Sequence, residues 1–360
     1  MRAPLGASSV HPVVRVTGNF TAEAPLSVAV QQSLLAAFDQ GWADPKKLSQ
    51  ASAKAAILRN QSVENIAHGL GVKTDELHIL GEPSLGHFLS IAGLLKPASD
   101  FFYSATDKGK IRAIARAHPG ISTEMSVDPS GQIIFPQTVA DQSVVSVQLA
   151  NGETGIIQKI DNALLRESFV AIDATSSGKR VPLPPHWDTA VFDAQSWGGP
   201  SGLGILAISN VSRYTYPLPR IAPISVPGSF SLPLLIAASV AMESFVMEDT
   251  AQREFLISQL KNISGLVIVG EGTPSLPHQL SCIVDGVSAE HLVRNLSARG
   301  FDIDSGSACS PEDLQPSHVI AAMGLPTNGH LRFTLHQETS KNEIESLVKN
   351  LQEVSEELRR

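Results

Sequence analysis

An α/β fold with a mainly parallel sheet, followed by a smaller C-terminal α+β domain, is predicted by three features of the 360-residue sequence. Short apolar runs alternate with longer segments of helical spacing through the first two-thirds of the chain, as in βαβ units. These runs are continuous in Val, Ile and Leu, which is typical of strands buried on both faces of a parallel sheet. A Pro-rich connection at 214–233 then leads into a segment where helices and strands alternate differently.

Each predicted helix or strand depends on a local pattern. Pro25 opens the first helix, because proline suits the first helical turn and apolar residues recur after it at helical spacing. Thr339-Ser340 followed by Glu343 resembles a capping box at the start of the last helix. The other predicted helices are 45–69, 86–95, 107–117, 160–167, one long helix at 234–263, 288–299, 316–323 and 341–358. The predicted strands are 76–80, 101–104, 144–149, 169–172, 189–192, 203–208, 280–284 and 331–335.

Composition and charge exclude several classes of function. The net charge is -8 and no basic tract is present, so nucleic acid is not an expected partner. The longest apolar run, 232–242, is too short to cross a bilayer, and the N-terminus lacks the basic and apolar regions of a secretion signal. Only two cysteines occur, Cys282 and Cys309, without a CxxC motif or a His-rich cluster. We therefore expect a cytoplasmic protein with no disulfide framework, no metal site and no membrane partner.

The most specific segment is SGSACSPEDLQPSHVIAAMGLP, at 305–326. Its Cys309 stands between small residues in a loop, where a thiol is unhindered, as a sulfur-transferring nucleophile requires. On spacing alone an inert loop thiol is the favoured interpretation, since most single cysteines have no chemical role. The length of the whole segment, rather than the cysteine, indicates ancestry.

This segment resembles the cysteine loop of the cysteine desulfurases, in the class-V aminotransferase superfamily, together with the helix that anchors the loop. The resemblance implies fold type I of the pyridoxal-phosphate (PLP)-dependent transferases, with a seven-stranded, mainly parallel sheet and a homodimer with sites near its interface. We place the large domain at 22–233 and the small α+β domain at 1–21 and 234–360. Further segments that resemble family segments, in the right order and spacing, are ANGETGIIQKI (150–160), FVAIDATSSGKRVPL (169–183), FDAQSWGGPSGLGIL (192–206) and LRFTLHQETSKNEIE (331–345).

The family's chemistry depends on a lysine that this chain lacks. In the family, the strand ahead of a Gly-Gly-Pro turn ends in Ala-His-Lys, and that lysine forms the Schiff base with PLP. The matching positions here are Ala194, Gln195 and Ser196, and a serine hydroxyl cannot form an imine. No lysine lies between Lys179 and Lys261 to replace it. We therefore expect no covalently attached cofactor, and PLP only if it is held non-covalently.

Three positions match family residues that contact the cofactor ring. Asp173 matches the aspartate that pairs with the pyridine nitrogen, although an aspartate that closes a strand often caps the next turn instead. Ser176 stands where the family has a glutamine that contacts the phenolic oxygen. Lys108 stands where the family has the stacking histidine. We expect Lys108 to be an exposed residue at a helix start, with an alternative imine-forming amine as the second interpretation.

The phosphate-binding turn also departs from the family pattern. The family has Gly-Ala-Thr at a helix N-terminus, where backbone N–H groups and the helix dipole hold the phosphate. Here Gly81 is followed by Glu82 and Pro83, so one N–H donor is missing and a carboxylate is present. Ser229 matches the family residue that reaches the phosphate across the dimer, or it caps the following helix.

Two residues match family positions that bind the substrate. Arg332 matches the arginine that holds the substrate carboxylate, a role that suits the forked guanidinium group. An ion pair at the domain boundary is the structural alternative. Asn151 is retained from the family's Asn-Asn-Glu motif, whose second asparagine is Gly152 here, and Gln337 replaces a second basic residue.

Loss of the Schiff-base lysine, the stacking histidine and the phosphate turn together predicts that cofactor binding itself has been lost. The first hypothesis is a non-catalytic member in sulfur or Fe–S metabolism. It forms a homodimer, or a heterodimer with an active desulfurase, and relays sulfur through Cys309 to an acceptor protein. The second is an active PLP-dependent desulfurase or lyase with an altered site, and the third is a small-anion binding protein on the same fold. Whether the chain is an enzyme stays open among these alternatives.

Overall fold

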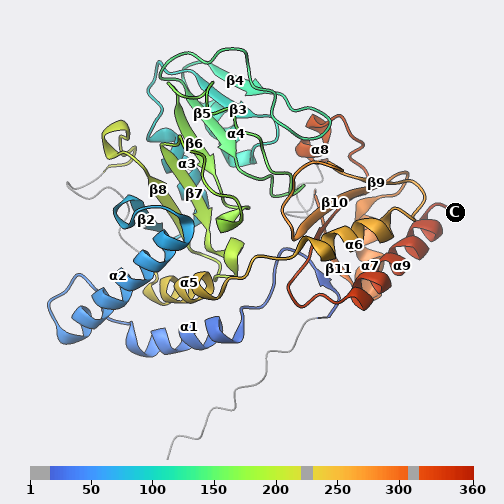
Figure 1. Cartoon of the computed structure of the whole chain (residues 1–360), viewed down its shortest axis with the longest axis horizontal. Coiled ribbons are helices and arrows are strands. Elements are labelled where there is room, and N and C mark those ends of the chain that lie inside the picture. The colour runs from blue at the N-terminus through green and yellow to red at the C-terminus, as the bar shows by residue number, and fades with distance from the viewer. Residues whose placement is uncertain (1–16, 220–229, 307–315) are drawn as a thin grey trace, which may run out of the picture.

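The computed structural model describes residues 17–219, 230–306 and 316–360, and its larger sheet has seven strands (Figure 1). The strand order is β2-β8-β7-β6-β5-β3-β4, in which β4, β3, β5, β6 and β7 are paired in parallel and β8 is antiparallel to β7 and β2. All residues of β5, β6 and β8 are buried, as expected of strands covered on both faces. The predicted α/β fold with a mainly parallel seven-stranded sheet is confirmed. The strands are β2 (Leu77–Leu80), β3 (Phe101–Ser104), β4 (Ser122–Met125), β5 (Val144–Gln148), β6 (Phe169–Asp173), β7 (Thr189–Asp193) and β8 (Gly204–Ile208).

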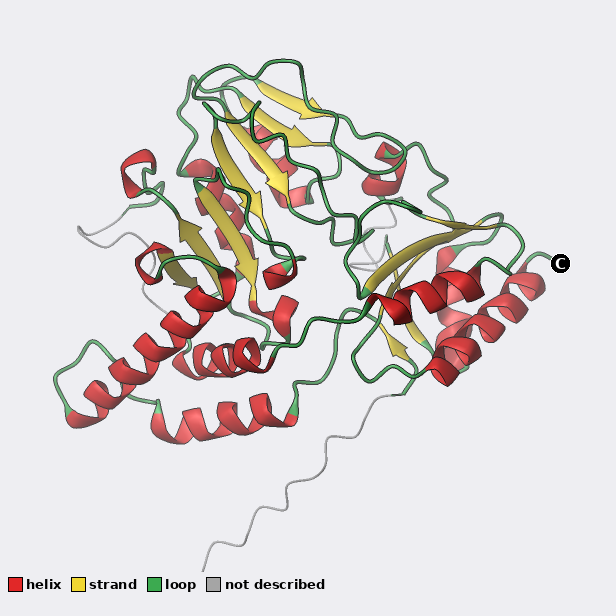
Figure 2. Cartoon of the chain, in the orientation of Figure 1, coloured by secondary structure: helices red, strands yellow, loops and turns green. Residues whose placement is uncertain are grey.

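Helices cover this sheet (Figure 2). α3 packs against β7 and β8, and α5 packs against both α1 and α2. α1 starts after Ser27, which caps the helix by accepting the Val30 N–H, so the predicted start at Pro25 is slightly early. Within the described ranges, no helix combines the length and apolar content needed to cross a membrane. These helices are α1 (Val28–Gln40), α2 (Gln50–Leu70), α3 (Pro83–Ala92), α4 (Gly109–Ala117) and α5 (Leu232–Ser244).

A second sheet of five strands, in the order β1-β11-β12-β10-β9, forms the smaller part of the molecule. β1 brings an early segment of the chain into this part by pairing in parallel with β11, whereas the other pairs are antiparallel. The last helix begins with the predicted capping box, formed by Ser340 and Glu343. The elements are β1 (Asn19–Phe20), α6 (Thr250–Leu260), β9 (Leu266–Ile268), β10 (Gln279–Val284), α7 (Ala289–Ala298), β11 (Asp302–Ser305), α8 (His318–Ala322), β12 (His330–Thr334) and α9 (Lys341–Leu358).

The prediction of one long helix at 234–263 is wrong, because the chain forms two helices there. α5 ends at Ser244, and α6 starts after Asp249, whose carboxylate accepts the Ala251 N–H at 3.0 Å. The first of these helices packs on α1 and α2, and the second packs on α9. These contacts favour a domain boundary after Ser244, and the predicted boundary at residue 233 stays a prediction.

The prediction of a helix at 160–167 is also wrong, because this stretch forms turns. The Asp161 carboxylate accepts the N–H groups of Ala163 and Leu164, at 3.1 and 3.0 Å, and this local bonding replaces helical bonding. The short strands β1, β4, β9 and β11 were not predicted. Each has at most four residues, too few to establish a period in the sequence.

Candidate functional site

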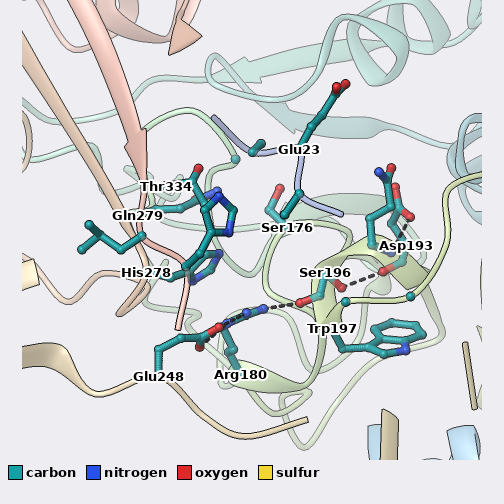
Figure 3. Close-up of a pocket in the computed structure, with 18 of the residues that line it drawn as sticks. Glu23, Ser176, Arg180, Asp193, Ser196, Trp197, Glu248, His278, Gln279 and Thr334 are labelled. Atoms are coloured by element: carbon teal, nitrogen blue, oxygen red, sulfur yellow. Dashed lines mark hydrogen bonds and ion pairs between the residues drawn. The ribbon is translucent and has the colours of Figure 1, made fainter. Parts of the chain in front are cut away.

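A cavity of about 870 Å³ lies between residues of the seven-stranded part and residues of the five-stranded part (Figure 3). On one side it is lined at the carboxyl ends of β5, β6 and β7, where parallel sheets commonly bind ligands. On the other side it is lined by the start of β10 and the end of β12. We call these the large-domain wall (Lys108, Asn151, Thr175, Ser176 and Ser196) and the small-domain wall (His278, Gln279, Arg332, Thr334 and His336).

Ser196 lies in a short 3-10 helix, Ala194–Trp197, directly after β7. Its hydroxyl donates a hydrogen bond to the Asp193 carbonyl oxygen at 2.6 Å, and the Asp193 carboxylate accepts the Gln195 N–H at 3.0 Å. Gln195 and Ser196 both line the cavity, as the resemblance predicted for their positions. The group that the chain presents here is therefore a hydroxyl that already has an acceptor within its own turn.

The Asp173 carboxylate is buried at the end of β6 and has partners on both oxygens. Lys108 Nζ and His87 Nε2 lie 3.3 and 3.1 Å from Oδ2, while Oδ1 accepts the N–H and hydroxyl of Thr175 at 2.9 and 2.5 Å. Burial raises the pKa of Asp173, but the positive charge of Lys108 and the His87 contact outweigh it and hold the pKa well below the usual range. This carboxylate is therefore ionised and already paired.

Lys108 was expected to be an exposed residue at a helix start. It is the N-cap residue of α4, but its side chain is only 36% exposed, and the ammonium group also donates to the Thr175 hydroxyl. The helix-start position is as expected, but the side chain is only partly exposed, because the buried charge of Asp173 attracts this ammonium group.

The N-terminus of α3 is capped by a residue of its own chain. The Glu82 carboxylate accepts the N–H groups of Ser84 and Leu85 at 3.0 and 2.7 Å, and Pro83 supplies no N–H at the first helical position. Slight burial raises the pKa of Glu82, but these hydrogen bonds lower it further than burial raises it. Gly81 precedes this cap and does not line the cavity. The backbone donors that the resemblance assigns to a phosphate are thus occupied by a carboxylate.

Asn151 is buried, and its side chain organises the loop after β5. Its Oδ1 accepts the N–H groups of Glu153 and Thr154, both at 2.9 Å, and its Nδ2 donates to the Thr106 carbonyl oxygen at 3.2 Å. These bonds use both ends of the amide to hold backbone. Asn151 lines the cavity, but it is engaged within the protein.

Arg332 also lines the cavity, and its guanidinium group has partners on the protein. Nη2 lies 2.6 Å from Asp304 Oδ2, and Nη1 donates to the Gly152 carbonyl oxygen at 3.1 Å. Arg332 thus forms an ion pair, as in the structural alternative, but its partner lies on the neighbouring strand of the same five-stranded sheet. A side chain at Gly152 would place its Cβ 2.4 Å from Ser176 Oγ, so these two positions are matched in size.

Arg180 and Glu248 were missed by sequence reasoning, although both line the cavity (Figure 3). Arg180 Nε donates to Glu248 Oε2 at 2.8 Å, and Nη1 donates to the Ser196 carbonyl oxygen. Its Cζ lies 4.8 Å from the centre of the Phe245 ring, in a cation–π contact. The two charged residues are 68 positions apart, and no spacing rule links them.

Apart from Arg332, the residues of the small-domain wall were also missed. His278, Gln279 and Thr334 are 9%, 7% and 5% exposed, and Gln279 and Thr334 face each other across the β10–β12 ladder. Within the described part of the chain, His278 Nδ1, Gln279 Oε1 and Thr334 Oγ1 have no hydrogen-bond partner. Burial and the charge of Arg180 lower the pKa of His278 to about 3, so its ring is neutral at pH 7.

Two predicted site residues, Cys309 and Ser229, lie outside the described residues. Among the residues that are described, no group of three or more His, Cys, Asp or Glu side chains has an arrangement that could hold a metal ion.

The contacts of the large-domain wall do not fit PLP held as the resemblance implies. The position of the imine-forming lysine carries a hydroxyl that is bonded to Asp193. The carboxylate that would face the pyridine nitrogen is paired with Lys108, and the N-terminus that would hold the phosphate is capped by Glu82. Each of these three groups is already bonded within the protein.

Comparisons with known proteins agree with the fold and with the motifs. The family model of aminotransferase class-V matches residues 226–347. The cysteine desulfurase IscS of Dictyoglomus turgidum is 23% identical, over 95% of this chain and 94% of its own length. Cysteine desulfurase 2 of Trichormus variabilis is 29% identical over 66% of this chain and 65% of its own length.

Solved structures show the same fold at low sequence identity. A NifS-like protein superimposes with a TM-score of 0.84 at 20% identity, covering 95% of this chain and 100% of its own. A NifS-like protein from Rickettsia africae superimposes with a TM-score of 0.81 at 18% identity, covering 94% and 99%. From the motifs, the fold and these relatives together, the chain is similar to the class-V aminotransferases and, among them, to the cysteine desulfurases.

Proposed function

We propose that this chain is a cysteine-desulfurase-like protein without PLP-dependent desulfurase activity, and that it acts as a subunit of a dimer and as a sulfur carrier. The observation that carries the first part is the state of the large-domain wall. The Ser196 hydroxyl of this wall, the Asp173 carboxylate that pairs with Lys108 of this wall, and the α3 N-terminus are all occupied by groups of the chain itself. A ligand that used the same groups would have to displace each of these contacts.

Lys108 does not replace the missing lysine in this proposal. Its Nζ lies 3.3 Å from the buried Asp173 carboxylate and donates to the Thr175 hydroxyl, so attack on an aldehyde would require the amine to leave both contacts. The same pairing weakens the small-anion hypothesis. Like Lys108, the other cavity-lining cations Arg180 and Arg332 already have carboxylate partners.

Activity measurements test the loss of desulfurase function. We expect purified protein with added PLP, cysteine and a reducing thiol to release no more sulfide or alanine than the buffer does. We also expect Ser196→Lys alone to remain inactive, because Asp173 and the α3 N-terminus stay occupied. Catalytic turnover by the natural sequence would refute the proposal and support the altered-site enzyme instead.

The sulfur-carrier role rests on Cys309 in its family-like segment. In the proposed step, the Cys309 thiolate attacks the outer sulfur of a donor protein's persulfide. The donor's S–S bond breaks, the donor leaves as a thiolate, and Cys309 becomes the persulfide. Mass spectrometry after incubation with a persulfidated desulfurase tests this. We expect one added sulfur that Cys309→Ser abolishes and Cys282→Ser does not, because Cys282 is buried and burial raises the pKa of its thiol. No sulfur on the natural protein would leave only a structural role.

The dimer role is supported by an apolar stripe on the outer side of α1. Val28, Leu35 and Phe38 lie on one helical face and are 42%, 68% and 58% exposed, and Trp42, just after the helix, is 74% exposed. Exposed apolar patches of this kind mark interaction sites. Light scattering should show a dimer that Phe38→Ser converts to a monomer, while Ile121→Ser, at another exposed apolar position, does not. A monomeric natural protein that also fails to bind an active desulfurase would exclude this role.

A further inference from the structure

The small-domain wall of the cavity contains buried polar atoms that lack partners. The atoms are His278 Nδ1, Gln279 Oε1 and Thr334 Oγ1, and all three side chains line the cavity and are more than nine-tenths buried. A buried polar atom without a partner is unfavourable, so such atoms are rare and call for an explanation. A bound ligand that supplies the missing partners is one such explanation.

The Gln279 amide and the Thr334 hydroxyl can direct their polar groups toward a ligand. The terminal torsion of a glutamine side chain is broad, so the Gln279 amide can direct its oxygen into the cavity. The Thr334 hydroxyl hydrogen rotates to suit its partner, and the neutral His278 ring offers one donor and one acceptor. Figure 3 shows these three side chains together at one side of the cavity.

The charges around the cavity indicate which ligand these side chains accept. Among the described residues, only three lining residues are Lys or Arg, and each contacts a carboxylate of the protein. An anionic ligand would therefore find no unpaired cation. A cationic ammonium ligand has only hydrogen-bond donors, so it would leave the hydrogen of the unpartnered Thr334 hydroxyl without an acceptor. The pairs are Lys108 with Asp173 at 3.3 Å, Arg180 with Glu248 at 2.8 Å and Arg332 with Asp304 at 2.6 Å.

We propose that His278, Gln279 and Thr334 form a binding subsite for an uncharged polar group, and specifically for a primary carboxamide. A carboxamide has two N–H donors, one of which Gln279 Oε1 accepts, and one carbonyl acceptor that suits the Thr334 hydroxyl or the His278 N–H. The cavity volume of about 870 Å³ is within the range of sites for drug-sized ligands, so the carboxamide can be part of a larger molecule. The proposal goes beyond the proposed function, because neither sulfur transfer nor dimer formation uses this subsite.

Three probes of similar shape test the charge preference. Benzamide is neutral, benzoate is its anionic counterpart and benzylammonium its cationic counterpart. In titrations of the full-length protein followed by saturation-transfer NMR at pH 7, we expect saturable binding of benzamide and at least about fivefold weaker binding of the two ions. No saturable benzamide binding, or benzoate binding as tight as benzamide binding, would overturn the proposal.

Two substitutions test the location of the subsite. Thr334→Val and Gln279→Leu each remove one unpartnered polar group at similar size, and each should weaken benzamide binding by about fivefold. Thr123→Val, the same change at an exposed position on β4, should leave binding unchanged. A thermal melt establishes that both cavity variants are folded. If both bind benzamide as tightly as the natural protein, the subsite is not where we place it.

Discussion

The two walls of the cavity differ in how their polar groups are satisfied. On the large-domain wall, Ser196, Lys108 and Asn151 have partners within the chain. On the small-domain wall, polar atoms of Gln279 and Thr334 have none among the described residues. The family resemblance assigns a cofactor to the first wall. The polar groups there are already bonded to other groups of the chain. The second wall is the place where a different ligand would gain hydrogen bonds.

The largest expected effect comes from breaking the pairing on the satisfied wall. Asp173→Asn leaves the Lys108 ammonium and His87 without their ionised partner, which should lower the free energy of unfolding by about 3 kcal/mol at pH 7. Urea unfolding measures this loss. Glu124→Gln, which breaks a half-exposed pair with Arg112, is the control and should cost about 0.5 kcal/mol. Equal losses in the two variants would show that Asp173 is not specially paired.

The pH dependence of the same variant sharpens the test. Because the folded-state pKa of Asp173 lies below the unfolded-state value, its pairing stabilises the protein at pH values above the unfolded pKa of about 3.9. This stability is lost as the pH falls through the folded-state pKa. The difference between natural and Asp173→Asn protein should therefore shrink as the pH falls below about 4. A difference that grows below pH 4 would contradict the assigned direction.

We expect the buried Asp107 carboxyl to affect the pH dependence of stability in the opposite direction to Asp173. It is fully buried, and burial raises its pKa to about 7. Because the unfolded state ionises at lower pH than the folded state, stability is lost as the pH rises from the unfolded pKa to about 7. The effect of Asp107→Asn on the free energy of unfolding should be more stabilising at pH 8 than at pH 4, by about 2 kcal/mol. Unfolding curves at the two pH values check this prediction, and a gain that is the same at both pH values would exclude it.

The smallest expected effect concerns the unsatisfied wall. Thr334→Val replaces a buried hydroxyl that has no partner by a methyl group, which should raise the free energy of unfolding by about 1 kcal/mol in the absence of ligand. Thr123→Val, at an exposed position, should change it by less than about 0.5 kcal/mol. A clear loss of stability in Thr334→Val would mean that the hydroxyl has a partner after all.

Most of the fold could be predicted from the sequence because buried strands are continuous apolar runs. The strand 101–104 matches β3 at both ends, and β6 differs from its prediction by one residue. β4, whose sequence is STEM, was missed because an edge strand with exposed polar residues has no apolar run. The helices α5 and α6 were merged because the apolar residues near Phe245 continue the pattern across the break.

The site could be predicted only where one position decides the chemistry. The absence of an amine at position 196 is visible in the sequence, and so is the carboxylate of Glu82 at the helix start. The sequence does not show that Lys108 pairs with Asp173 or that Arg180 pairs with Glu248, because folding brings these distant residues together. The unpartnered atoms of β10 and β12 are likewise a property of the packed structure alone.

The most direct test of the central claim is borohydride reduction in the presence of PLP, followed by peptide mapping. The natural protein is incubated with PLP and reduced, and pyridoxyl groups are located by mass spectrometry. Because Ser196 has no amine and Lys108 is paired with Asp173, we predict no stoichiometric label on any residue that lines the cavity. A pyridoxyl group on Lys108 in most molecules, absent from Lys108→Ala, would contradict this claim and make the chain a PLP enzyme with a relocated imine.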